Sequence, residues 1–208
     1  MNDFSPDILD FAKGDGLLPV IVQDNNSLRI LMLGYMNREA LDETLRSGLV
    51  TFYSRSKQRL WQKGETSGHT LKLVSITTDC DQDALLARVL PQGPTCHTGA
   101  VSCFDQKDEG RDDLSFLADL QALIHKRHEE QPAGSYTTQL FQQGMPRMAQ
   151  KVGEEGVEVA LAATAEPHKL CEEAADLIYH LLVVLEASEK SLTDIIKVLR
   201  QRHKVAAK

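Results

Sequence analysis

Asp105-Gln106-Lys107-Asp108-Glu109-Gly110-Arg111-Asp112 is the stretch that separates two different patterns in this chain of 208 residues. All of its residues are polar or charged apart from one glycine, a composition typical of a linker between domains. Short segments rich in β-branched and aliphatic residues dominate before it, whereas helical periodicity dominates after it. We therefore expect two domains, at 1–108 and 109–208.

The N-terminal half predicts an α+β domain that is rich in strands. Segments typical of strands lie at 18–23, 28–36, 50–54, 71–77 and 85–90. One helix is expected among them, over 38–46. It should begin at Asn37, a favourable N-cap residue, and end at Gly48, because glycine readily adopts the left-handed conformation at a helix end.

The C-terminal half predicts an all-α helical bundle. An apolar face with helical spacing is formed by Leu114, Leu117, Leu120, Leu123 and Ile124. Pro146 and Pro167 suit the first turns of two further helices. Ser191 and Asp194 form a variant of the capping box, so a last helix should begin there.

The composition indicates a globular protein without a nucleic-acid surface or a membrane span. Hydrophobic residues make up 42% of the chain, and the net charge of −7 is spread over both halves without a basic stripe. No run of about 18 apolar residues occurs, and residues 1–7 lack the basic and apolar regions of a signal peptide. We expect a cytoplasmic protein whose four cysteines are reduced thiols.

Two segments, 78–83 and 93–104, offer ligands for two kinds of metal. Zinc would suit the thiolates of Cys80, Cys96 and Cys103, and three ligands leave a fourth position for water, as in catalytic zinc sites. Magnesium would suit the carboxylates of Asp79, Asp81 and Asp83. If 78–84 is extended, the three carboxylates share one face and Cys80 lies on the other. The alternative is a set of buried apolar cysteines beside a solvated strand edge.

Acidic residues at helical spacing predict a second divalent-cation site in the C-terminal half. Glu155 and Glu158 are three residues apart on one expected helix, and Glu173 and Asp176 are three apart on another. If the two helices pack antiparallel, the four carboxylates can hold magnesium between them. The alternative is a solvated acidic face. The apolar neighbours argue against it, and so does the absence of a lysine four residues after each acid.

The metal-ligand segments also carry a family resemblance. Residues 79–84 (DCDQDA) and 93–104 resemble the signature of phosphoribosyl-AMP cyclohydrolase, an enzyme of histidine biosynthesis. Residues 54–56 and 60–69 match the other marked segment of that family, and the resemblance covers about residues 10–108. It implies a dimer in which the zinc ligands are drawn from both chains.

The spacing ExxE at 155–158 and ExxD at 173–176 resembles the α-helical nucleotide pyrophosphohydrolases. Together with 135–137, 150–155 and 173–180, it is similar to phosphoribosyl-ATP pyrophosphohydrolase over about 113–203. The two reactions are consecutive, so the resemblances imply a bifunctional enzyme of histidine biosynthesis. The C-terminal domain would hydrolyse phosphoribosyl-ATP to phosphoribosyl-AMP and pyrophosphate. The N-terminal domain would then add water between N1 and C6 of the adenine ring and open it.

The residues of the N-terminal domain suit the ring opening. Zinc activates water at neutral pH for attack on C6. We expect His97, beside Cys96, to transfer a proton, with a solvent-facing or supporting position as its alternative. The nucleotide is expected to contact Trp61, Lys63, Glu65, Ser67 and His69. For Trp61 the alternative is core packing.

The acidic helices of the C-terminal domain carry further candidates. Glu154 is expected to act as a base and Lys151 to contact phosphate, with a surface position as the alternative for the lysine. His180 is expected in the core. Gly153 and Gly156 weaken a helix, which suggests a close approach or a local distortion there. Residue 156 is often alanine in the family that this domain resembles.

Two other functions stay open from the sequence. One is a non-catalytic zinc module joined to an interaction bundle, which predicts a closed four-ligand zinc site and no turnover. The other is a C-terminal domain that hydrolyses non-standard nucleoside triphosphates. Pyrophosphate release from phosphoribosyl-ATP, compared with release from a panel of such nucleotides, separates these functions.

Overall fold

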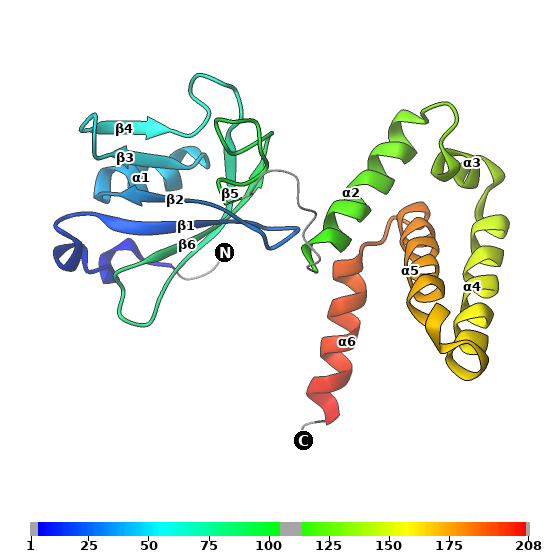
Figure 1. Ribbon diagram of the computed structural model, residues 1–208. Coiled ribbons are helices and arrows are strands. Elements are labelled where there is room, and N and C mark those ends of the chain that lie inside the picture. Colours follow the sequence, from blue (N-terminus) through cyan, green and yellow to red (C-terminus); the bar gives the residue numbers. More distant parts are fainter. Residues whose placement is uncertain (1–3, 105–113, 207–208) are drawn as a thin grey trace. The chain divides into compact units, whose positions relative to one another are not determined.

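The structure, a computed structural model, describes residues 4–104 and 114–206. It divides into two compact units, Met1–Ser115 and Phe116–Lys208. The first unit is rich in strands and the second is made of helices, which confirms the predicted fold class of each half (Figure 1). The linker expected at 105–112 lies outside the described residues.

A four-stranded sheet in the order β2-β1-β6-β5 forms the frame of the N-terminal unit. The central strand β1 (Leu18–Asp24) is antiparallel to β2 (Ile30–Met36) and parallel to β6 (Leu85–Pro91). Strand β6 is in turn antiparallel to β5 (Leu71–Thr78). Two short 3₁₀ turns, η1 (Pro6–Ile8) and η2 (Phe11–Gly14), precede the sheet.

A two-stranded hairpin of β3 (Thr51–Ser54) and β4 (Arg59–Gln62) forms a second, separate sheet. All five predicted strands are present, and β4 is an additional one. It lacks a sequence signal because its four residues begin and end with polar side chains, so the alternation typical of a strand is too short to detect.

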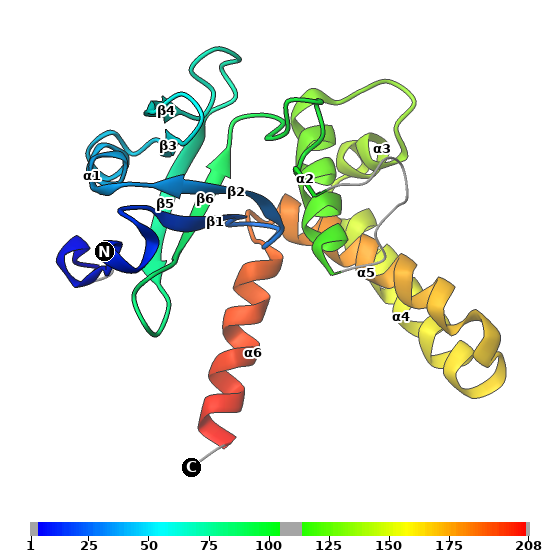
Figure 2. The same ribbon diagram turned by 60° about the vertical axis from the view of Figure 1, so that its left-hand side comes forward.

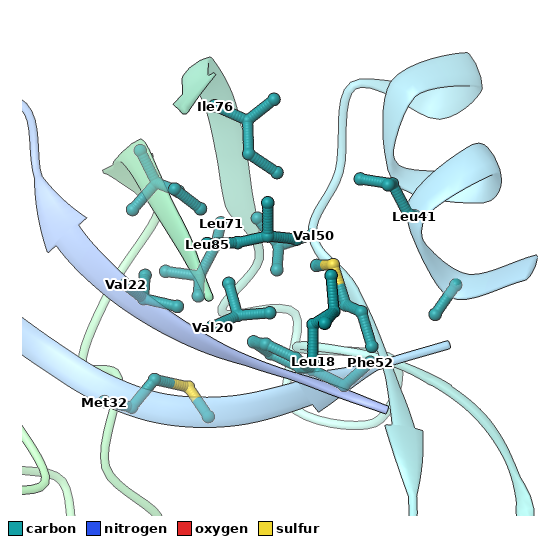
Figure 3. Packing of buried hydrophobic residues seen from close by; sticks show 14 of the residues in the cluster. Leu18, Val20, Val22, Met32, Leu41, Val50, Phe52, Leu71, Ile76 and Leu85 are labelled. Atoms are coloured by element: carbon teal, nitrogen blue, oxygen red, sulfur yellow. The ribbon is translucent and has the colours of Figure 1, made fainter. Parts of the chain in front are cut away.

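Helix α1 (Arg38–Ser47) packs with the hairpin beside the sheet and helps to enclose the core of this unit. Its predicted ends are confirmed. The Asn37 side chain accepts a hydrogen bond from the Ala40 N–H at 2.8 Å, and Gly48 ends the helix with φ of 72°. Alternate residues of β1 are fully buried and face the core, as Figure 3 shows for Leu18, Val20 and Val22.

The C-terminal unit consists of helices joined by short turns (Figure 2). The helices are α2 (Ser115–Glu130), α3 (Tyr136–Gln143), α4 (Met145–Ala165), α5 (Leu170–Ala187) and α6 (Leu192–Ala206). Helices α4 and α5 lie side by side in both ribbon views, and the short η3 turn (Pro167–Lys169) joins them. A small core contains Ile124, Leu140, Met148, Leu182 and Val183. No helix within the described part of the chain is long and apolar enough to cross a membrane.

Most helix starts follow the sequence signals, with one exception. Pro146 lies in the first turn of α4, and Ser191 and Asp194 cap α6 reciprocally, with the Ser191 N–H donating to Asp194 at 3.0 Å. Pro167 starts the η3 turn rather than a long helix.

The expected apolar face of α2 is buried only in part. Ile124 is fully buried, whereas Leu114 lies before the helix and is 86% exposed.

Candidate functional sites

The acidic segment that follows β5 is a turn and not the extended strand expected from the sequence. Strand β5 ends at Thr78, and Gln82 has a φ of 66°, which no strand residue adopts. Asp79 Oδ1 closes the turn by accepting hydrogen bonds from the Asp83 N–H at 3.1 Å and the Ala84 N–H at 3.2 Å. The expected alternation of carboxylates with Cys80 across a strand is therefore wrong.

This turn nevertheless brings the three aspartates together. One carboxylate oxygen from each of Asp79, Asp81 and Asp83 lies within 4.8 Å of the others, close enough to hold one metal ion. The Lys13 ammonium lies 3.0 Å from Asp81 Oδ2 and 3.4 Å from Asp83 Oδ2. The hydrogen bond to Asp81 raises the pKa of Lys13. No sequence signal identifies Lys13, which is 68 residues from Asp81 along the chain.

Two of the three candidate zinc ligands lie in the loop that follows β6. The Thr98 hydroxyl donates to Cys96 Sγ at 3.1 Å, and His97 Nδ1 is 3.8 Å from the same sulfur. The Thr98 hydrogen bond, with a smaller contribution from the Cys103 side chain, holds the pKa of the Cys96 thiol below its ordinary value. A lowered thiol pKa favours the thiolate that binds zinc.

The third cysteine is separate from these two. Over residues 4–104 and 114–206, groups of three potential ligand atoms within 4.8 Å form from the aspartate turn and from the glutamates of the helical unit, and not from cysteines. Cys80 is an exposed residue of the aspartate turn, and no disulfide joins any of the four cysteines, all of which the structure describes. A single chain thus does not bring Cys80, Cys96 and Cys103 into one group.

The candidate nucleotide-binding segment at 61–69 is only partly open to solvent. Trp61 packs against the core residue Phe52, with ring centroids 5.7 Å apart, so it has a packing role. Glu65 is paired with Arg59 at 2.7 Å. Ser67 is exposed, and its hydroxyl accepts a hydrogen bond from the His69 N–H at 3.3 Å.

Lys63 and His69 contact each other, and glycines pack closely around His69. Lys63 is 8% exposed, and its ammonium donates to the His69 carbonyl at 3.5 Å. A Cβ on Gly64 would lie 2.5 Å from the carbonyl carbon of His69, and a Cβ on Gly93 would lie 2.7 Å from Cδ2 of its ring. The two glycines, both at positive φ, therefore let the backbone approach His69 from two sides.

Three of the four predicted acids of the helical unit converge. One carboxylate oxygen from each of Glu155, Glu158 and Glu173 lies within 4.8 Å of the others, whereas Asp176 is outside this group. Glu155 is buried, and its carboxylate raises the pKa of Glu158 by hydrogen bonding and repulsion. The Lys151 ammonium is 2.5 Å from Glu155 Oε1, and this contact lowers the pKa of Glu155.

Glu154 lies on the same helix and shares the partner Lys151 with Glu155. Lys151 approaches its Oε2 at 3.0 Å, while Gln150 and Arg147 approach its Oε1 at 2.8 and 3.4 Å. The Lys151 hydrogen bond holds the pKa of Glu154 below its ordinary value. Glu154 is therefore a weaker base than an isolated glutamate, and its expected role as the base stays a prediction.

His180 is buried beside the glutamate group, as expected for a core residue. Its Nε2 is 3.8 Å from Glu155 Oε1, and its pKa is lowered by burial and by the charge of Lys151. The close approach expected at Gly153 and Gly156 is wrong for the described chain, because a Cβ at either position meets no atom within 4 Å.

Comparisons with known proteins match both halves. The family model described as Phosphoribosyl-AMP cyclohydrolase matches residues 32–105, and the model described as Phosphoribosyl-ATP pyrophosphohydrolase matches residues 117–203. The Histidine biosynthesis bifunctional protein HisIE of Xylella fastidiosa (strain Temecula1) is 59% identical over 197 residues, covering 94% of this chain and 93% of that protein. Proteins of the same name from Xanthomonas campestris pv. campestris and Vibrio cholerae serotype O1 are 57% and 53% identical. They cover 95% and 98% of this chain, and 94% and 100% of their own lengths.

Proposed function

The chain belongs to the family of bifunctional histidine biosynthesis proteins, and from this premise we propose which residues perform each of its two reactions. The C-terminal unit is a phosphoribosyl-ATP pyrophosphohydrolase and the N-terminal unit a phosphoribosyl-AMP cyclohydrolase. The product of the first reaction is the substrate of the second. The family favours these activities over a non-catalytic zinc module or a hydrolase of non-standard nucleotides.

In the C-terminal unit we assign a magnesium site to Glu155, Glu158, Glu173 and Asp176. The observation that carries this assignment is the convergence of three of these carboxylates within 4.8 Å. Oxygen ligands of this kind suit magnesium, which when bound would neutralise the triphosphate and activate water. Lys151, one helical turn before Glu155, would contact a phosphate group, and Glu154 would accept a proton.

In the N-terminal unit we assign magnesium to Asp79, Asp81 and Asp83, whose carboxylates converge in the same way. Zinc is assigned to Cys80, Cys96 and Cys103, and when bound it would supply the Lewis acidity that activates water for ring opening. His97, 3.8 Å from Cys96 Sγ, would move a proton. Trp61, Lys63, Glu65, Ser67 and His69 would contact the nucleotide, and Trp61 would also pack against Phe52.

The separation of Cys80 from Cys96 and Cys103 within one chain supports a zinc site shared between two copies. We therefore propose a homodimer in which Cys80 of one copy joins the other two cysteines of its partner. We also propose that the protein is cytoplasmic, where its cysteines would stay reduced. We place the domain boundary between residues 108 and 109, so that fragments 1–108 and 109–208 each fold and keep their own activity.

Glu158→Gln tests the C-terminal assignment because it removes one charge and keeps the shape of the side chain. Pyrophosphate release should be lost while ring opening stays unchanged. Glu172→Gln is the matched control, since Glu172 is an exposed residue outside the glutamate group and should be replaceable without loss. Retained pyrophosphate release in Glu158→Gln would place this carboxylate on a merely solvated face.

Mixing variants tests the shared zinc site. Cys80→Ser and Cys103→Ser should each lose zinc and ring opening, whereas a mixture should regain both in part, because a heterodimer keeps one intact site. The control mixture of Cys96→Ser with Cys103→Ser should not recover, because these two ligands come from the same chain. Zinc content equal to that of the unchanged protein in all single variants would refute the site.

A further inference from the structure

His180 is a buried residue, but the surroundings of its two ring nitrogens are unusual for a side chain in a protein core. It lies on α5 one turn after Asp176 and is 5% exposed. Its Nε2 faces Glu155 Oε1 at 3.8 Å, and its Nδ1 is buried without a hydrogen-bond partner. Buried polar atoms are nearly always paired, so a buried imidazole with one unpaired nitrogen and one nitrogen near a carboxylate requires an explanation.

The surrounding residues fix the position of the His180 ring. The rings of Tyr136 and Tyr179 pack edge-on against it, with centroids 6.0 and 5.1 Å away. The Tyr179 hydroxyl is 2.8 Å from the hydroxyl of Thr137, which also accepts a hydrogen bond from Arg127 at 3.1 Å. In this packing Nε2 lies 3.8 Å from Glu155 Oε1, and Nδ1 has no hydrogen-bond partner.

The same oxygen of Glu155 already has a donor, the ammonium of Lys151. Lys151 Nζ is 2.5 Å from Glu155 Oε1, whereas His180 Nε2 is 3.8 Å from it, which is beyond hydrogen-bond length. A divalent cation bound by the glutamates would repel the ammonium of Lys151, because both are positive. It would exert no such repulsion on a neutral imidazole N–H, so His180 is the next donor available to this oxygen.

We propose that His180 is a positioning residue of the pyrophosphohydrolase site, which donates its Nε2–H to Glu155 and orients this carboxylate toward a bound divalent cation. The proposal rests on the proposed function, in which Glu155 is a metal ligand. Ligating carboxylates in metal sites are commonly held by such outer hydrogen bonds, and loss of one typically lowers metal affinity about 10- to 100-fold.

The test is a titration of the full-length protein with Mn²⁺, followed by electron paramagnetic resonance of the free ion. The same titration of Glu158→Gln measures binding outside the glutamate group and is subtracted. Three substitutions are compared: His180→Gln, His180→Asn and His180→Phe. Glutamine places its amide nitrogen about as far from the backbone as Nε2, asparagine about as far as Nδ1, and phenylalanine fills the space without a donor.

We expect His180→Gln to keep the affinity within about threefold, and His180→Asn and His180→Phe to lower it about 10- to 100-fold. His168→Gln, on the exposed η3 turn, is the control and should change nothing. If His180→Phe loses its helical circular dichroism, the comparison of His180→Gln with His180→Asn tests the proposal instead, since both variants keep a polar side chain. Equal affinity for all three variants would overturn the proposal. Mn²⁺ binding unchanged by Glu158→Gln would instead refute the glutamate site itself.

Discussion

One substitution, glycine to alanine, should have opposite effects on stability in the two units. Gly34 lies in β2 against the buried ring of Phe52, and a Cβ there would be 2.4 Å from the ring atoms Cδ1 and Cε1. Gly156 lies inside α4, where a Cβ would meet no atom within 4 Å. The same added methyl group therefore creates a clash in one unit and occupies open space in the other.

The expected magnitudes follow from these surroundings. Forcing an extra methyl into a packed core costs about 1–3 kcal/mol of the free energy of unfolding. Replacing glycine by alanine inside a helix, where nothing obstructs the Cβ, contributes up to about 1 kcal/mol of stability. For a unit of roughly 100 residues, 1 kcal/mol shifts the melting temperature by about 4–8 °C. Gly34→Ala should lower the N-terminal transition by about 4 °C or more, and Gly156→Ala should raise the C-terminal one by up to about 8 °C.

The assay is differential scanning calorimetry of the full-length protein and both variants. After brief heating to graded temperatures, ring opening and pyrophosphate release are measured to assign each transition to a unit. Ring opening should be lost earlier in Gly34→Ala and pyrophosphate release later in Gly156→Ala. A shift of both transitions by the same amount in either variant would refute the independence of the units. A lowered C-terminal transition in Gly156→Ala would show that another segment, such as a second copy, approaches α4 there.

Three further substitutions have defined outcomes. Lys63→Met should lower ring opening but change the free energy of unfolding, measured by urea titration, by no more than about 1 kcal/mol. The reason is that the single 3.5 Å hydrogen bond of the buried ammonium offsets little of the cost of burying its charge, so losing both has a small net effect. A loss above about 3 kcal/mol would contradict this. Lys13→Gln should tighten Mn²⁺ binding at the aspartate turn, because the ammonium no longer competes for two carboxylates; weaker binding would count against a cation site there. His125 has its pKa raised above the ordinary 6.5 by its hydrogen bond to Glu186, so the stability from this pair is complete below pH 6.5 and is lost as pH rises through the raised value. His125→Gln should flatten that fall in urea unfolding measured across neutral pH, and an unchanged slope would exclude the pair as its source.

Much of the secondary structure could be predicted because its causes are local. The N-cap at Asn37, the stop at Gly48 and the reciprocal cap of Ser191 and Asp194 each depend on residues within a few positions of one another. The same holds for Glu155 and Glu158, which helical spacing places on one ridge. Such features are visible in a single sequence because the backbone geometry that creates them is regular.

The features that were missed depend on contacts between distant segments or on turn geometry. The positive φ of Gln82 turns the chain after β5, and no glycine marks this position. Lys13 reaches the turn from far away in the sequence, and Gly93 meets the ring of His69 across more than 20 residues. Spacing rules describe one regular element at a time, so they cannot predict a contact with a side chain from another element.

The lysine beside the glutamates changes the argument for a metal in the helical unit. No lysine lies four residues after any of the four acids, but Lys151 lies four residues before Glu155 and contacts it. Uncompensated repulsion is therefore not by itself a reason to expect a cation, because an ammonium already lies within the group. The reason that remains to expect a cation is the negative charge of the glutamates that one ammonium cannot balance. The pKa of Glu158 stays raised by Glu155, with a further contribution from Glu173, although Lys151 is near. Three carboxylates facing one ammonium leave an excess of negative charge at their point of convergence, and a divalent cation would neutralise it.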